Sequence, residues 1–143
     1  MKKINRYDIT KEHIIAFHTL IICSFHGMYE ARSNDSLDAV LEMYNSTSSA
    51  NGNTVSRASA LIYAIVRFHP FLDANKRTAI ISCATYLLMN GFVLEANDDD
   101  LLQVLCEIEN GSISREELRE WMMERVVPIA DESVTASNIH AVI

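Results

Sequence analysis

Apolar side chains recur at helical spacing along most of this chain, and only two prolines, Pro70 and Pro128, are present to interrupt a helix. A period of three to four residues predicts amphipathic helices rather than strands, in which apolar residues alternate. The first predicted helix begins after the N-cap candidate Thr10 and ends at Gly27. Its buried stripe is expected at Ile14, Phe17, Ile21 and Phe25. The sequence therefore predicts an all-α fold.

The segment from Asn75 to the terminator Asn90-Gly91 is nearly apolar on every side. A helix of this kind usually lies in the middle of a bundle, because every face needs cover from water. We expect a compact helical bundle in which this helix is central. Further helices are predicted at 35–44 and 56–68, the second of which ends before Pro70.

Capping residues mark the last two predicted helices. Asn97 is expected to cap one that begins with three aspartates, and Ser114 with Glu117 forms a capping box for the other. The stretch 45–54 is rich in Ser, Asn and Gly, which predicts a loop or a short hairpin. We expect one domain over residues 1–127 and a loosely ordered tail over 128–143.

Charge and composition exclude several classes of protein. Acidic residues outnumber basic ones 19 to 12, which gives a net charge of −7 and no basic surface for nucleic acid. The longest nearly apolar stretch, Ala79 to Met89, is shorter than the roughly 20 residues that a membrane span needs. Three cysteines without a paired spacing indicate neither disulfides nor a zinc site. The expected location is the cytoplasm.

Nine residues before the apolar helix, His69 to Arg77, bring together an imidazole, a carboxylate, an amide and two cations. Their position at a helix N-terminus matters, because the free N–H groups and the dipole there attract anions. Lys76 and Arg77 add positive charge, and the fork of a guanidinium suits phosphate oxygens. The segment therefore predicts a phosphate seat.

Two other groups of this segment fit phosphate chemistry. Asp73 could hold a magnesium ion that bridges phosphates, and His69 could accept the proton of an attacking hydroxyl. The residue types alone also fit a purely structural role, in which Asp73 or Asn75 caps the helix and the cations are solvated. His13 and His18 are five residues apart, which does not pair them for a metal, and both are expected to be structural.

The nine residues resemble the Fic signature HxFx(D/E)(G/A)N(G/K)R and match every specified position. The continuation Asn75-Lys76-Arg77-Thr78-Ala79 resembles the Doc branch of the Fic/Doc superfamily, the death-on-curing toxins. Typical Fic enzymes have glycine where Lys76 stands and an arginine where this chain has Ile80. The similarity covers about Lys11 to Val126, and it implies a Fic/Doc-type bundle. The stretch 45–54 corresponds in position to the Fic flap.

The resemblance assigns roles to the segment. It implies that His69 and Arg77 are catalytic and that Asp73 binds Mg²⁺, with ATP as the substrate. The implied nucleotide-binding residues are Phe71, as a core anchor, together with Asp73, Ala74, Asn75, Lys76 and Arg77.

In Doc-type proteins the lysine changes the phosphate nest, so the γ-phosphate of ATP is delivered to a protein hydroxyl. The implied function is a toxin kinase that modifies a Ser or Thr of a target such as elongation factor Tu and arrests growth. Ser112 to Glu116 only partly resembles the inhibitory (S/T)xxxE(G/N) motif, because Glu117 follows it. An antitoxin acting in trans is therefore expected. Two alternatives remain open: a Fic-type AMP-transferase, and an inactive binding module with the same fold.

Overall fold

Helices form the body of the structure, a computed structural model that describes residues 8–25, 34–47 and 54–129. The six helices of these ranges are α1 (Lys11–Phe25), α2 (Asn34–Ser46), α3 (Thr54–Phe68), α4 (Asn75–Met89), α5 (Asp98–Glu109) and α6 (Arg115–Met123). Two short strands, β1 (Phe92–Leu94) and β2 (Val126–Pro128), complete the described part. The predicted helical class is confirmed, and none of the described helices is both long and apolar enough to cross a bilayer.

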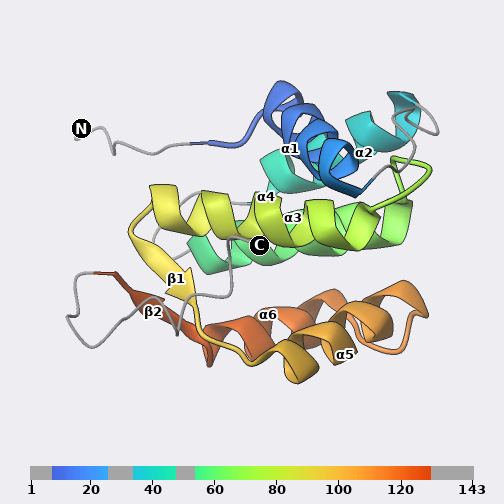
Figure 1. The fold of residues 1–143 in the computed structure, drawn as a ribbon. Helices are drawn as coiled ribbons and strands as arrows, with labels where there is room; N and C mark the ends of the chain where they lie inside the picture. Colours follow the sequence, from blue (N-terminus) through green and yellow to red (C-terminus); the bar gives the residue numbers. More distant parts are fainter. Residues whose placement is uncertain (1–7, 26–33, 48–53, 130–143) are drawn as a thin grey trace.

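The helices are arranged in three layers, with α3 and α4 in the middle (Figure 1). The pair α1 and α2 lies on one side of this layer, and α5 and α6 lie on the other. α3 packs against α2, α4, α5 and α6, whereas α4 packs against α3, α1 and β1. The apolar helix that was expected to be central therefore shares the centre with α3. The junction between these two helices lies between the outer layers.

The apolar stripes predicted from the sequence face the core. Ile14 and Ile21 of α1 are buried and Phe17 is partly buried against the core, whereas the side chain of Phe25 lies outside the described part. Leu101, Leu105 and Ile108 of α5 are buried as well. The predicted caps are also confirmed. Asn97 accepts a hydrogen bond from the N–H of Asp100, and Ser114 and Glu117 form the reciprocal pair of a capping box.

A small antiparallel sheet, which the sequence did not predict, joins the end of α4 to the end of α6. Phe92 pairs with Pro128 and Leu94 pairs with Val126. Proline lacks an N–H group and is tolerated at the end of such an edge strand. Pro128, which was assigned to the tail, is thus the last residue of β2. Residues 130–143 lie outside the described part, so the tail stays a prediction.

The stretch 45–54, which was predicted to be a loop or a short hairpin, lies largely outside the described residues, which omit 48–53. The edges of that stretch are helical. Asn45 and Ser46 are the last residues of α2, and Thr54 is the first residue of α3.

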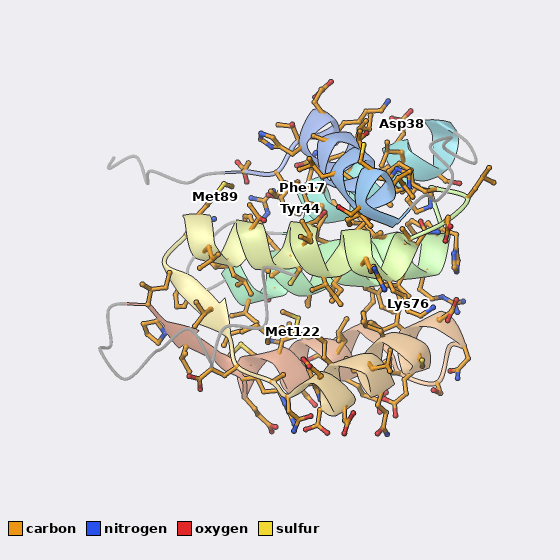
Figure 2. All side chains as sticks on the ribbon, viewed as in Figure 1. Phe17, Asp38, Tyr44, Lys76, Met89 and Met122 are labelled. Carbon is orange, nitrogen blue, oxygen red and sulfur yellow. The ribbon has the colours of Figure 1, made fainter. Side chains whose placement is uncertain are left out.

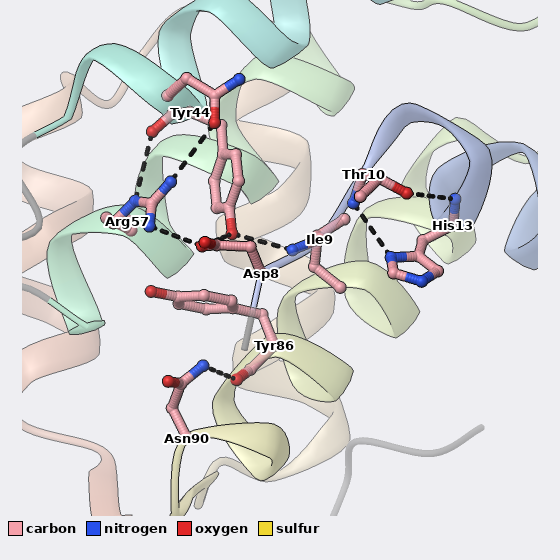
Figure 3. A network of polar contacts seen from close by, with 9 residues as sticks. Asp8, Ile9, Thr10, His13, Tyr44, Arg57, Tyr86 and Asn90 are labelled. Atoms are coloured by element: carbon pink, nitrogen blue, oxygen red, sulfur yellow. Dashed lines mark hydrogen bonds and ion pairs between the residues drawn. The ribbon is translucent and has the colours of Figure 1, made fainter. Parts of the chain in front are cut away.

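A buried arginine ties the start of α1 to α2 and α3 (Figure 3). Arg57 is 5% exposed, donates to Asp8 at 2.7 Å and lies 4.2 Å from the centre of the Tyr44 ring. The Tyr44 hydroxyl accepts from the N–H of Ile9 and donates to Asp8. Burial raises the pKa of this hydroxyl, so it keeps the proton that it donates. The network fixes where α1 begins.

We predict that Tyr44→Phe lowers the free energy of unfolding by about 1–3 kcal/mol, because the buried N–H of Ile9 loses its acceptor. In a domain of this size each kcal/mol lowers Tm by roughly 4 °C. Thermal unfolding followed by circular dichroism measures the effect. Tyr63→Phe, at a partly buried tyrosine of α3, is the control and should change Tm much less. Equal Tm values for the wild type and Tyr44→Phe would contradict the role given to the hydroxyl.

Candidate active site

The loop between α3 and α4 runs from His69 to Ala74, and its backbone is unusual at both ends. His69 has φ 48° and Ala74 has φ 64°, and these are the described non-glycine residues with a positive φ. Each such residue costs on the order of 1–3 kcal/mol and persists only where its surroundings impose it. The loop therefore turns sharply after α3 and again before α4.

The side chain of Asn75 imposes much of this geometry. Its Oδ1 accepts from the N–H of Phe71 at 3.0 Å, and its Nδ2 donates to the carbonyl of Phe71 at 2.9 Å. Because the peptide N–H only donates and the carbonyl only accepts, the two bonds fix which way the amide points. The same Nδ2 lies 3.2 Å from Nδ1 of His69. Asn75 thus holds the loop together from inside.

The helix that follows the loop has no side-chain cap. Its N-cap residue is Ala74, which makes no side-chain cap hydrogen bond. The structural alternative, in which Asp73 or Asn75 caps α4, is therefore wrong. The first intrahelical bond runs from the N–H of Thr78 to the carbonyl of Ala74, so the N–H groups of 75–77 precede it.

His69 lies between an amide and a carboxylate. Its Nδ1 faces the Nδ2 donor of Asn75, and its Nε2 lies 3.6 Å from Oε2 of Glu109, the last residue of α5. In the neutral ring Nδ1 is therefore the acceptor and Nε2 carries the proton. The other carboxylate oxygen of Glu109 lies 2.8 Å from Nζ of Lys76. Figure 2 shows Lys76 on the side of α4 that faces α5 and α6.

An open cavity of about 350 Å³ lies between α1 and the start of α4. Ile21 and Ile22 of α1 form its apolar wall, and residues 73–77 form its polar wall. Five of the sequence-predicted site residues thus line one cavity: Asp73, Ala74, Asn75, Lys76 and Arg77. Phe71 is 2% exposed and packs beneath the loop, as expected of an anchor. The cavity combines an uncapped helix N-terminus with two cationic side chains, which suits an anion.

The sequence model of the Fic/DOC family matches residues 8–87. This chain belongs to the Fic/DOC family. The match spans more than half of the chain and contains the loop, the cavity and both isoleucines of the apolar wall. Members of the family are generally transferases, whereas the match does not separate the Doc branch from the others. No curated protein matched the chain.

The Fic/DOC match ends inside α4, but the site does not. Glu109 reaches it from α5, beyond the matched residues. The hydrogen bond from Lys76 holds the pKa of the Glu109 carboxyl below its usual range, so the group is charged at neutral pH. Glu109 was not predicted from the sequence. One signal was present, because acidic side chains in the last turn of a helix oppose its dipole and need a partner elsewhere.

His18 is a second residue whose connection to the Fic/DOC loop was missed. It is 1% exposed, its ring stacks on Phe71 at 3.8 Å, and its Nε2 donates to the carbonyl of Asp73 at 3.0 Å. Burial lowers the pKa of His18, which keeps the ring neutral. The expected structural role therefore holds, but the structure that it supports is the loop itself. A signal in the sequence was available, because His18 lies four residues from both Ile14 and Ile22 and so shares their buried face of α1.

Asp73 is the candidate ligand for Mg²⁺. Its side chain is exposed, and its Oδ1 accepts from the N–H of Ala74 at 2.8 Å. Within the described ranges, no three His, Cys, Asp or Glu side chains gather closely enough to hold a metal by themselves. Mg²⁺ commonly binds through one or two carboxylates together with substrate phosphates. The donor set thus fits an ion that arrives with a nucleotide.

We predict that His18→Phe lowers the free energy of unfolding by about 1–2 kcal/mol, because the ring stack can persist while the hydrogen bond to Asp73 is lost. His18→Ala also removes the stack and leaves a cavity, so its cost should be about 3 kcal/mol or more. Urea unfolding of both variants measures the difference. His13→Ala, at an exposed position of the same helix, serves as the control. If His18→Phe and His18→Ala lowered the free energy of unfolding by the same amount, the ring stack and the hydrogen bond would not contribute separately, which would contradict the prediction.

Proposed function

We propose that this Fic/DOC protein is a phosphotransferase that moves the terminal phosphate of ATP to a Ser or Thr hydroxyl of another protein. The observation that carries the proposal is the cavity at the uncapped start of α4, lined by Lys76 and Arg77. His69 is not among its lining residues, but Lys76 reaches from the cavity to Glu109, which lies next to His69. The oxygens of the bound polyphosphate would accept hydrogen bonds from the N–H groups of 75–77 and from the guanidinium of Arg77. Asp73 would hold Mg²⁺, which supplies charge neutralisation between phosphates when it is bound.

The transfer breaks the bond between the γ-phosphorus and the oxygen that bridges it to the β-phosphate. The attacking hydroxyl forms the new P–O bond, its proton passes to Nε2 of His69, and ADP leaves. This base role requires a lone pair on Nε2, whereas in the resting arrangement Nε2 carries the proton. We therefore include in the proposal a shift of the ring proton to Nδ1, with the acceptor hydroxyl as the new partner of Nε2. Because Nδ1 and Nδ2 of Asn75 would then both be donors, this step gives up the contact between His69 and Asn75.

Lys76 favours phosphate transfer over AMP transfer. A glycine at this position is typical of Fic enzymes that transfer AMP, and the second arginine of those enzymes is replaced by Ile80. The side chain of Lys76 extends toward α5 and meets Glu109, so it borders His69 as well as the cavity. A cation at that point suits a phosphoryl group that is approached from the side of His69.

We predict that the wild type transfers label from γ-labelled ATP, and not from α-labelled ATP, to a protein of a cell extract. His69→Ala should lower the rate by about 10²–10⁴, the usual contribution of a positioned base. His13→Ala should leave the rate unchanged. Transfer of the α-label would identify an AMP-transferase, and binding of ATP without transfer of either label would identify an inactive binding module.

The resemblance to the Doc branch extends the proposal to a growth-arresting toxin whose target is a translation elongation factor. It also supports a partner in trans, because the inhibitory motif is incomplete in this chain.

We predict that expression of the chain alone arrests bacterial growth and that His69→Ala does not. Co-expression of a small protein encoded next to this gene should restore growth and co-purify with the chain. Normal growth with an active, unpartnered enzyme would contradict the toxin role but not the transfer.

A further inference from the structure

The end of α5 is fixed against both ends of the loop. Arg67, in the last turn of α3, donates through Nη1 to the carbonyl of Ile108 at 3.4 Å and to that of Glu109 at 3.1 Å. Gly111 lies directly against the same guanidinium, because a Cβ there would be 3.3 Å from Nη1. The backbone of Glu109 is therefore held by the helix that ends at His69.

The carboxylate of Glu109 then connects the two functional side chains. It lies 2.8 Å from Nζ of Lys76 and 3.6 Å from Nε2 of His69, although these residues come from opposite ends of the loop. All three side chains are about one-third exposed. The ammonium and the imidazole thus share one anionic neighbour on the side of α4 that faces α5.

Charge gives this arrangement a consequence for proton transfer. When His69 takes up a proton it becomes a cation, and a second cation nearby opposes that step. The ammonium of Lys76 is such a cation. The carboxylate of Glu109 lies 2.8 Å from that ammonium and offsets its charge. Removal of the carboxylate would also release Lys76 to turn toward the phosphates.

We infer that Glu109 is a positioning residue of the transfer reaction, which holds Lys76 in place and balances its charge beside His69. This inference rests on the proposed function. It predicts a separation between binding and turnover. Loss of the carboxylate should leave nucleotide binding equal or tighter, because a negative charge is removed and Lys76 is freed, while the transfer step becomes slower.

The experiment compares the wild type with Glu109→Gln, Lys76→Met and the double variant. Calorimetry gives the Kd for ATP with Mg²⁺, and γ-labelled ATP at saturation with a cell extract gives the transfer rate. We expect Glu109→Gln to bind ATP as tightly as the wild type or up to about tenfold more tightly, and to transfer at least about tenfold more slowly. Glu107→Gln removes the same charge from the same helix, where Glu107 contacts Gln103 instead, and should match the wild type.

The Lys76→Met background tests whether Glu109 acts through the lysine. There, Glu109→Gln should change the rate by less than about twofold, since the ammonium that it balances is gone. An equal loss of rate in both backgrounds would show a merely structural role and overturn the inference. A faster saturating rate for Glu109→Gln would overturn it too, because the carboxylate would then only compete with the nucleotide.

The two proposals can fail separately. Absence of γ-label transfer by the wild type would refute the proposed function. If the Glu109→Gln variant binds ATP more weakly than the wild type, Glu109 does not restrain the side chain of Lys76 as proposed, whether or not transfer is seen. Tighter binding that disappears with Lys76→Met would support that hold independently of transfer.

Discussion

The amide of Asn75 is the interaction on which the rest of the site depends. Its two bonds to the backbone of Phe71 close the loop, and its third contact sets the orientation of His69. Because the amide is buried, no water can replace it cheaply. The loop that it closes ends at Ala74, which has a left-handed conformation and, as an alanine, no side-chain acceptor to cap α4. The same residue therefore fixes the turn into α4 and orients the imidazole beside it.

Much of the fold followed from local sequence. Helical spacing located the helices, and Asn97, Ser114 and Glu117 marked ends that the structure reproduces, because caps act within a few residues. The strands β1 and β2 escaped notice for the opposite reason. Each has three residues, too few to show an alternating pattern, and each exists through its pairing with a distant segment.

The candidate site shows the same division. The residues from His69 to Arg77 indicated the loop and the five residues that line the cavity, since they are consecutive, while phosphate binding there stays a prediction. The exact part played by Asn75 was not visible, because an asparagine before a helix looks like a cap until the path of Phe71 is known. Glu109 and His18 were missed as neighbours of the loop, since they are brought there by the packing of α5 and α1. Tertiary contacts of this kind leave only a faint trace in a single sequence.

The contacts of His18 connect α1, which lines the cavity, to the loop. The helix that carries His18 also supplies Ile21 and Ile22, which form the apolar wall of the cavity. The side chain of His18 therefore connects the helix of this wall to Phe71 and Asp73 of the loop. Sliding α1 away from α4 would separate the stacked rings and break the bond to Asp73 at the same time. The width of the gap between α1 and α4 therefore depends on the same two contacts that hold the loop, so a change at His18 would alter the cavity and the loop together.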